Sequence, residues 1–284
     1  MKAELLYDTK VELGEGPVWD ARTGTLFWID ILGKRMYAGA EVIAELEETV
    51  GCFALRKSGG FIFTGQHSFR SLETATGETS VLLTLREESA HNRFNDGKCD
   101  PCGRFLAGTM DLGESKNTGS LYSFDGKVAT KLLGGVTISN GLAWSPDYRT
   151  FYFIDTPTRT VRAFDYDLET GAIANGRVVL QVEGRLGWPD GMTSDMQGNL
   201  WIAMWAGEKI TKWNPYTGDL LAEIPVPAKN VSSCVFGGKH MNELFVTSAR
   251  KGLDRETLEK YPLTGGMFRI ETDVEGMPSF EFGD

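Results

Sequence analysis

Short apolar runs separated by polar turns dominate the pattern of the chain. Residues 25–30, for example, read Thr-Leu-Phe-Trp-Ile-Asp, and a polar turn at residues 20–24 precedes them. Brief runs rich in aromatic and β-branched residues, bounded by Asp, Pro and Gly, are typical of strands. No stretch has a convincing 3.6-residue apolar period, and residues 255–260 are expected to form one helical turn at most. The pattern therefore predicts an all-β protein.

The predicted strands follow a repeat of about 45 residues that occurs six times. Each copy begins with a polar residue beside a small one, continues as a short strand, turns, and continues as an apolar-aromatic strand. The copies open at residues 15–19, 51–55, 95–98, 139–144, 189–192 and 232–236. Repeats of about 40–50 residues with several strands each are typical of propellers, whose blades surround a central channel.

Six copies predict a six-bladed β-propeller, with residues 1–284 forming a single domain. Residues 4–7 are predicted to add an outer strand to the last blade and so to close the ring. The competing fold is a β-sandwich with a second domain. The even spacing of the units, without a linker rich in Pro or Ser, favours the propeller.

The residue that opens each repeat is expected to face the channel at one end, because the first strand of each blade lines it. These positions hold Glu15, Val50 or Gly51, Asn95 and Asp96, Asn140, Asp190 and Ser233. Glu15, Asn140 and Asp190 are oxygen donors directly followed by Gly, which permits a backbone conformation or a close approach that a Cβ would block. Such an oxygen-only set is typical of sites for Ca²⁺, Mg²⁺ or Mn²⁺, and Zn²⁺ also accepts carboxylates.

Two interpretations of these polar residues stay open at this point. They could bind one divalent ion, or they could only cap strands and hydrogen-bond to one another across a solvated channel. Buried carboxylates placed close together without a cation repel each other, which favours the ion.

The charge of the chain excludes some classes of partner. The formal net charge is −10, from 39 acidic and 29 basic residues, so neither nucleic acid nor an anionic membrane is an expected partner. No run approaches about 18 apolar residues, and no apolar run follows the N-terminal Met-Lys-Ala-Glu, so we expect neither a membrane span nor a secretory signal. A cytoplasmic protein, a monomer or a small homo-oligomer, is the expectation.

Four separated motifs resemble those of one known family. They are LGEGPVW at residues 13–19, RFNDGK at 93–98, ISNGL at 138–142 and PDGM at 189–192. The sequence is similar in these motifs to the senescence marker protein, regucalcin and gluconolactonase family, and the similarity extends from about residue 8 to 270. The resemblance implies a six-bladed propeller, and members of that family include sugar-acid lactonases.

The resemblance also implies particular site residues. One divalent metal ion (Ca²⁺, Zn²⁺, Mn²⁺ or Mg²⁺) would be held by Glu15, Asn140 and Asp190. The substrate-binding residues that it implies are Arg93, Asn95 and Glu114, the last as the nearest candidate for a carboxylate in the loop after the third unit.

The function predicted on this basis is the divalent-metal-dependent hydrolysis of sugar-acid lactones by a gluconolactonase-like enzyme. Lactone hydrolysis passes through a tetrahedral oxyanion, and a cation with an open position can polarise the carbonyl and stabilise that charge. Asp190 is predicted to be a ligand and the general base, and the partner is a small sugar lactone. The alternatives are a Ca²⁺-binding regulatory protein of regucalcin type and an organophosphate hydrolase, because a metal polarises P=O as readily as C=O.

Two further features of the sequence have a structural and a functional interpretation. Cys99 and Cys102 have the CxxC spacing of redox and zinc sites, but they lie in a predicted turn without a second pair, which favours a role in the turn. Trp188 and Trp205 flank the predicted channel mouth, where either could form the wall of a substrate pocket.

Overall fold

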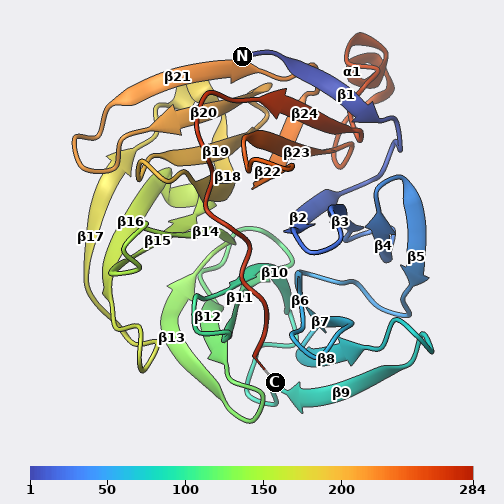
Figure 1. Ribbon diagram of the computed structural model, residues 1–284, viewed down its shortest axis with the longest axis vertical. Helices are drawn as coiled ribbons and strands as arrows, with labels where there is room; N and C mark the ends of the chain where they lie inside the picture. Colours follow the sequence, from blue (N-terminus) through green and yellow to red (C-terminus); the bar gives the residue numbers. More distant parts are fainter. Residues whose placement is uncertain (284) are drawn as a thin grey trace.

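The computed structural model, which describes residues 1–283, confirms the six-bladed β-propeller (Figure 1). Six four-stranded antiparallel sheets are arranged in a ring, and the first strands of neighbouring sheets contact one another around the centre. Each sheet runs outward from that first strand in the order of the chain, except in the last blade. The short apolar runs of the sequence therefore correspond to strands, and the copies of the repeat correspond to blades.

The first three blades occupy the N-terminal half of the chain. Their strands are β2 (Gly14–Asp20), β3 (Thr25–Asp30), β4 (Arg35–Ala38) and β5 (Glu41–Glu45) in blade 1; β6 (Phe53–Leu55), β7 (Phe61–Thr64), β8 (Ser68–Leu72) and β9 (Thr79–Thr84) in blade 2; and β10 (Asn92–Cys99), β11 (Phe105–Asp111), β12 (Gly119–Phe124) and β13 (Ala129–Val136) in blade 3.

The other three blades complete the ring. Their strands are β14 (Ser139–Trp144), β15 (Thr150–Asp155), β16 (Thr160–Tyr166) and β17 (Ile173–Gln181) in blade 4; β18 (Trp188–Ser194), β19 (Leu200–Trp205), β20 (Lys209–Trp213) and β21 (Leu220–Pro225) in blade 5; and β22 (Asn230–Gly237), β23 (Glu243–Ala249), β24 (Met267–Glu271) and β1 (Ala3–Tyr7) in blade 6.

The ring is closed by pairing the two ends of the chain, as the sequence predicts. Strand β1 lies antiparallel to β24 and forms the outer strand of blade 6, with Ala3 opposite Ile270. Since the chain continues from β1 into blade 1, the main-chain hydrogen bonds between β1 and β24 hold the start of blade 1 to the last blade.

Apolar side chains fill the spaces between neighbouring blades. Between blades 2 and 3, for example, Phe69 stacks on Phe124 with ring centroids 4.5 Å apart and meets Phe94 edge-on at 5.0 Å. Aromatic pairs at these distances add to the free energy gained from burial alone. The aromatic residues of the repeat therefore hold the blades at fixed angles around the channel.

Helical structure is sparse, as expected. The helix α1 (Arg255–Lys260) lies outside the ring (Figure 1), and Asp254 caps it by accepting a hydrogen bond from the Thr257 amide at 2.8 Å. Two short 3₁₀ turns are η1 (Thr156–Thr158) and η2 (Gly184–Leu186). The described residues contain no helix with the length and hydropathy that crossing a bilayer requires.

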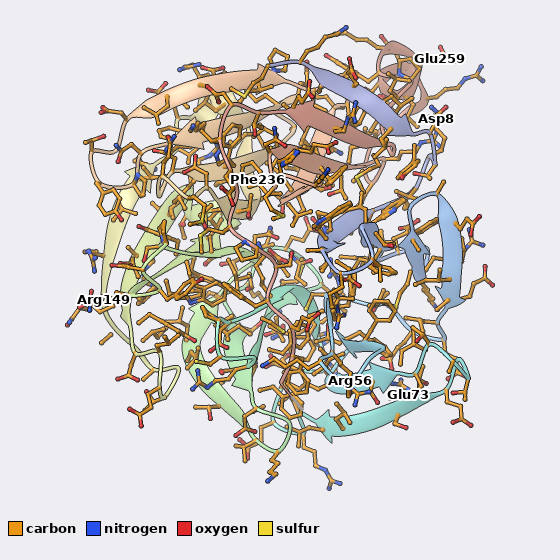
Figure 2. All side chains as sticks on the ribbon, viewed as in Figure 1. Asp8, Arg56, Glu73, Arg149, Phe236 and Glu259 are labelled. Atoms are coloured by element: carbon orange, nitrogen blue, oxygen red, sulfur yellow. The ribbon has the colours of Figure 1, made fainter. Side chains whose placement is uncertain are left out.

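After β24 the chain crosses the middle of one face of the propeller (Figure 1). This segment, residues 272–283, is called the C-terminal strap below. Figure 2 labels Phe236, which lies in blade 6 beside the strap. The strap contacts all six blades. An ion pair joins Glu281 to Arg22 in blade 1, and main-chain hydrogen bonds join Phe282 to Leu55 in blade 2, Gly283 to Gly103 in blade 3 and Met277 to Ser194 in blade 5. The Phe280 ring packs edge-on against Trp144 in blade 4, and Gly276 lies close to the Phe236 side chain in blade 6.

Candidate active site

A cavity of about 300 Å³ opens at the end of the channel where the innermost strands begin, opposite the strap. It brings together all six residues that the sequence analysis assigned to metal or substrate binding, and they come from blades 1, 3, 4 and 5 and from the loop that follows β11. The residues that line it are Leu13, Glu15, Arg93, Asn95, Met110, Glu114, Ile138, Asn140, Thr156, Pro157, Trp188, Asp190, Trp205 and Lys251.

A β-bulge interrupts the innermost strand at or beside each of the inner site residues. A bulge leaves residues unpaired, bends the strand and turns a side chain out of the regular alternation. The register is broken between Glu15 and Val18, Phe94 and Gly97, Asn140 and Leu142, Pro189 and Met192, and Val231 and Ser233. The breaks occur near the start of the innermost strand in five blades. The side chains that line this end of the channel therefore come from residues at or beside the interruptions in strand pairing.

The three glycines that follow the donor residues have the two uses that the sequence suggested. Gly16 has φ +51°, in the left-handed region that favours glycine. A Cβ on Gly141 would lie 2.7 Å from the Asp190 carbonyl oxygen, and one on Gly191 would lie 2.7 Å from the Ser233 Cα. One glycine therefore permits a backbone conformation, and the other two permit neighbouring innermost strands to approach closely.

The carboxylates at the bottom of the cavity lie in a strongly unfavourable electrostatic environment. Glu15 and Asp190 are 7% and 6% exposed. Burial and the nearby Asp96 carboxylate raise the pKa of Glu15 to about 8. Burial and the charges of Glu15 and Asp96 raise the pKa of Asp190 well above its usual value. Since both pKa shifts reflect the cost of concentrating negative charge in a buried space, this end of the channel favours binding of a cation.

A chain of hydrogen bonds fixes the Asn140 amide. The Thr156 hydroxyl donates to the Pro189 carbonyl at 2.8 Å, so its oxygen accepts from Asn140 Nδ2, also at 2.8 Å. This leaves Asn140 Oδ1 as the acceptor on the other side, where Asn95 Nδ2 donates to it at 3.0 Å. Arg93 Nη1 in turn donates to Asn95 Oδ1 at 2.8 Å. The network therefore fixes which end of the Asn140 amide is the oxygen, in a cavity that Glu15 and Asp190 also line.

Arg93 supplies a buried positive charge to the wall of the cavity. Its Nη1 also donates to the Phe94 carbonyl at 2.8 Å, which fixes the guanidinium. Burial lowers its pKa, whereas the carboxylates of Glu114, Glu15 and Asp190 oppose that shift. A guanidinium fixed in this way can donate to oxygen atoms of a ligand with little further ordering.

The rim of the cavity is formed by charged and aromatic side chains. Glu114, in the loop after β11, forms an ion pair with Lys251, in the loop after β23. On another part of the rim the Arg159 guanidinium stacks on the Trp188 indole, 3.5 Å from the ring centroid. Trp188 and Trp205 both line the cavity, so both tryptophans that the sequence placed at the channel mouth lie there.

Thr156 and Lys251 are two lining residues that the sequence analysis did not identify. Thr156 begins η1 in the run Asp-Thr-Pro-Thr and does not open a repeat, so no sequence signal connected it to Asn140. Lys251 follows the second strand of the last blade, and only closure of the ring brings it opposite Glu114. Both assignments depend on contacts between residues that are distant in the sequence.

The CxxC pair has a structural role, in agreement with the predicted turn. Cys99 is buried and Cys102 exposed, and all four cysteines are free thiols. Asp100 shapes the turn by accepting hydrogen bonds from the Cys102 and Arg104 amides at 2.9 and 2.8 Å. Burial raises the pKa of the Cys99 thiol well above its usual value, so this residue is a poor thiolate nucleophile.

The donor atoms at the bottom of the cavity fit a hard divalent cation. Glu15 and Asp190 offer carboxylate oxygens, and Asn140 offers an amide oxygen whose orientation is fixed. Burial, and after it the neighbouring carboxylates, raises the pKa of Glu15 and of Asp190, and a bound cation would stabilise their charged forms. Among residues 1–283 no cluster of three or more His, Cys, Asp or Glu side chains is placed to bind a metal, and an amide is the third donor of this set.

The fold and the cavity together define a class: a six-bladed propeller with a buried oxygen-donor site at one end of its channel. Residues 13–250 match the model of the SMP-30/gluconolactonase/LRE-like region. Regucalcin of Gallus gallus is 39% identical over 99% of this chain and 98% of its own length. The chain therefore belongs to the SMP-30/gluconolactonase/LRE-like family, and the resemblance found in the sequence is confirmed.

Two solved structures of high similarity agree with this assignment. A calcium-binding protein, regucalcin, of Agrobacterium tumefaciens superimposes with a TM-score of 0.93 at 28% identity, over 98% of this chain and 96% of that one. A luciferin-regenerating enzyme superimposes with a TM-score of 0.92 at 30% identity, over 99% of both chains. One of these relatives is named as a calcium-binding protein and the other as an enzyme, so membership of the family does not by itself decide between the two functions.

Proposed function

We propose that this protein hydrolyses sugar-acid lactones with the help of one divalent metal ion held by Glu15, Asn140 and Asp190. The observation that carries the proposal is the convergence of these three donors, from three blades, at the bottom of one cavity that Arg93 and Asn95 also line. A cavity of about 300 Å³ is large enough for a lactone ring with its hydroxyl groups. Membership of a family that includes gluconolactonases supports it.

Each residue has a role that its surroundings support. When bound, a divalent ion supplies a Lewis acid that polarises the lactone carbonyl. Arg93 donates hydrogen bonds to substrate oxygens and fixes the orientation of the ring, and Asn95, which lines the same cavity, holds the guanidinium by accepting from Arg93 Nη1. Asp190, which lines the cavity beside Glu15 and Asn140, takes a proton from the attacking water as the general base. The water oxygen then adds to the carbonyl carbon, the ring C–O bond breaks, and the proton held by Asp190 passes to the ring oxygen, which leaves as a hydroxyl.

The second candidate function is Ca²⁺ binding without turnover. It is favoured by the relatives named regucalcin, one of which is described as a calcium-binding protein. The same three donors would serve both functions, because Ca²⁺ prefers carboxylate and amide oxygens. The two candidates differ in whether the rest of the cavity, with Arg93 and the tryptophans, binds a substrate.

The experiment that separates the candidates is a lactone-opening assay on the protein treated with EDTA. We expect EDTA to abolish the opening of glucono-, galactono-, xylono- and arabinono-lactones, and a divalent ion to restore it. A phosphotriester in the same panel tests organophosphate hydrolysis, which we expect to be minor. Calorimetry measures Ca²⁺ affinity in parallel, and tight Ca²⁺ binding with no turnover of any lactone would support the regulatory protein instead.

Asp190→Asn is the variant that tests the proposed base. The substitution keeps the shape of the side chain and removes its charge, so we expect kcat to fall by about 10²-fold or more. Asp165→Asn is the control, because Asp165 lies on β16 with an exposed side chain that pairs with Arg177. Near-native turnover by Asp190→Asn would contradict the proposed role.

A further inference from the structure

An ion pair links two distant loops at the mouth of the cavity. The Lys251 ammonium contacts the Glu114 carboxylate, although the residues are 137 positions apart in the sequence. Both side chains line the cavity, and they are 32% and 44% exposed, whereas Glu15 and Asp190 below them are almost fully buried. The pair therefore occupies the outer part of the same cavity whose inner end holds the oxygen donors.

The backbone on both sides of the pair is held in place. The Lys251 amide donates to the Glu12 carbonyl at 2.9 Å, and the Lys251 carbonyl accepts from Asn230 Nδ2 at 3.1 Å. Glu114 has φ +56°, and its amide donates to the Asp111 carbonyl at 2.9 Å. Because the main chain is anchored, the ammonium and the carboxylate can change partners by side-chain movement alone. An ion pair this exposed is weak in water, so a ligand can share or displace it.

The charges of this pair favour one kind of ligand group over others. A hydroxyl group both donates and accepts, so it can bond to the Glu114 carboxylate and the Lys251 ammonium at once. A carboxylate or a phosphate on the ligand would meet the Glu114 carboxylate and would have to displace it from Lys251. Like charges placed side by side in an interface lower affinity, which is how such sites reject wrong ligands.

We propose that Lys251 and Glu114 form a paired donor and acceptor that binds hydroxyl groups of the substrate remote from the reacting carbonyl. The pair selects neutral polyhydroxy lactones over lactones that carry a carboxylate. This inference rests on the proposed function and adds to it the substrate class and a specificity-determining residue, Lys251. Removing the charge of Glu114 frees Lys251, and the site then accepts the anionic lactone.

The test uses the full chain with a divalent ion and two lactones of the same ring, one neutral and one with its terminal CH₂OH oxidised to a carboxylate. Both kcat and KM are measured for the unsubstituted protein, Lys251→Met and Glu114→Gln. Binding of the two matching lactams, in which NH replaces the ring oxygen, is measured by calorimetry as a readout independent of turnover. The matched control is Lys229→Met, because Lys229 pairs with Glu208 at 2.7 Å with similar exposure and does not line the cavity.

We expect the unsubstituted protein to prefer the neutral lactone, and Glu114→Gln to shift the ratio of kcat/KM toward the anionic lactone by about tenfold. Lys251→Met is expected to raise KM for the neutral lactone by about fivefold and to leave kcat within about twofold, as for a residue that binds remote hydroxyls. The lactam affinities should change in the same directions, and Lys229→Met should change none of these values.

Two results overturn the inference, and they are distinguishable from each other. If the unsubstituted protein opens neither lactone, the proposed function fails and the inference fails with it. If it opens lactones but the neutral-to-anionic ratio is the same in Glu114→Gln, Lys251→Met and the unsubstituted protein, only the inference fails, and the ion pair is a structural link between the two loops. Melting temperatures of all variants identify any effect of misfolding.

Discussion

The Asn140 amide shows at the scale of single residues how the site is oriented. The Thr156 hydroxyl donates to the Pro189 carbonyl, so its oxygen accepts from Asn140 Nδ2, and the Asn140 amide oxygen faces Asn95. The sequence predicted Asn140 as a donor because it opens a repeat and precedes Gly. It did not predict Thr156, which acts through Asn140 and belongs to no motif.

The raised pKa values predict how stability depends on pH when no metal is bound. Because the folded state raises the pKa of Glu15 from 4.5 to about 8, it binds the proton more tightly than the unfolded chain does. This contribution is fully present below pH 4.5 and is lost as the pH rises toward about 8. The melting temperature of the EDTA-treated protein should therefore fall over this range, and a saturating divalent ion should reduce the fall.

Glu15→Gln is the control for this pH effect. It removes the titrating group while keeping a hydrogen-bonding side chain, so the metal-free variant should lose less stability than the unsubstituted protein over the same pH range. Thermal unfolding by circular dichroism at a series of pH values measures both. Identical slopes for the two proteins would show that Glu15 does not carry the shifted pKa.

At the scale of elements, the bulges explain why the same strand can serve both the sheet and the site. In β18 the register resumes at Met192, which packs in the core, while Asp190 and Gly191 lie in the break and Asp190 lines the cavity. Of the residues predicted from their position in the repeat, Glu15, Asn95, Asn140 and Asp190 line the cavity. The residues that this lining does not include are Val50, Gly51, Asp96 and Ser233. The repeat did not predict the bulges, because a break in pairing depends on the partner strand as well as on the Asp-Gly pair itself.

The close contact between the innermost strands predicts the effect of filling it. A Cβ on Gly191 would lie 2.6 Å from the Ser233 Cβ and 2.7 Å from its Cα, so Gly191→Ala should push β18 away from β22. We expect a loss of about 2 kcal/mol of the free energy of unfolding, as for overpacking elsewhere. Gly134→Ala is the control, because a Cβ there meets nothing within 4 Å. Urea unfolding measures both, and equal stabilities would contradict the argument.

The sequence predicted features that are encoded by neighbouring residues, and it did not predict side-chain contacts between residues that are far apart in the chain. The blades and the donors Glu15, Asn140 and Asp190 follow from signals that recur with the repeat, and the closing strand follows from the apolar run that precedes the first repeat. The pairing of Lys251 with Glu114 joins blades 6 and 3, and no local pattern encodes it. The course of the strap is similarly hidden, since Phe280 and Phe282 resemble any short apolar run until their partners in the blades are known.

At the scale of the whole molecule, the strap connects the blades on the face opposite the site. Phe282 is 2% exposed, stacks parallel to Phe124 with centroids 5.9 Å apart, and bonds through its main chain to Leu55 and Lys57. Ser279 and Phe280 line the narrow space that lies in the channel beneath the site. The strap therefore stabilises the ring and fills the other end of the channel.

Phe282→Ala tests the contribution of the strap. Loss of a buried phenyl ring is expected to cost about 3 kcal/mol, which for a chain of this size lowers the melting temperature by roughly 5 °C. Tyr216→Ala is the matched control, because Tyr216 is 71% exposed and its loss should change little. Differential scanning calorimetry measures both, and a melting temperature unchanged in Phe282→Ala would show that the strap is dispensable for the ring.

The course of the strap has a consequence for traffic through the cavity. Residues 272–283 lie across the far side of the channel, so under the proposed function a lactone would enter, and the opened acid would leave, past the rim that includes Glu114 and Trp188. The outgoing acid would then follow the path of the incoming lactone. For such an enzyme we expect added product acid to act as a competitive inhibitor in the lactone-opening assay.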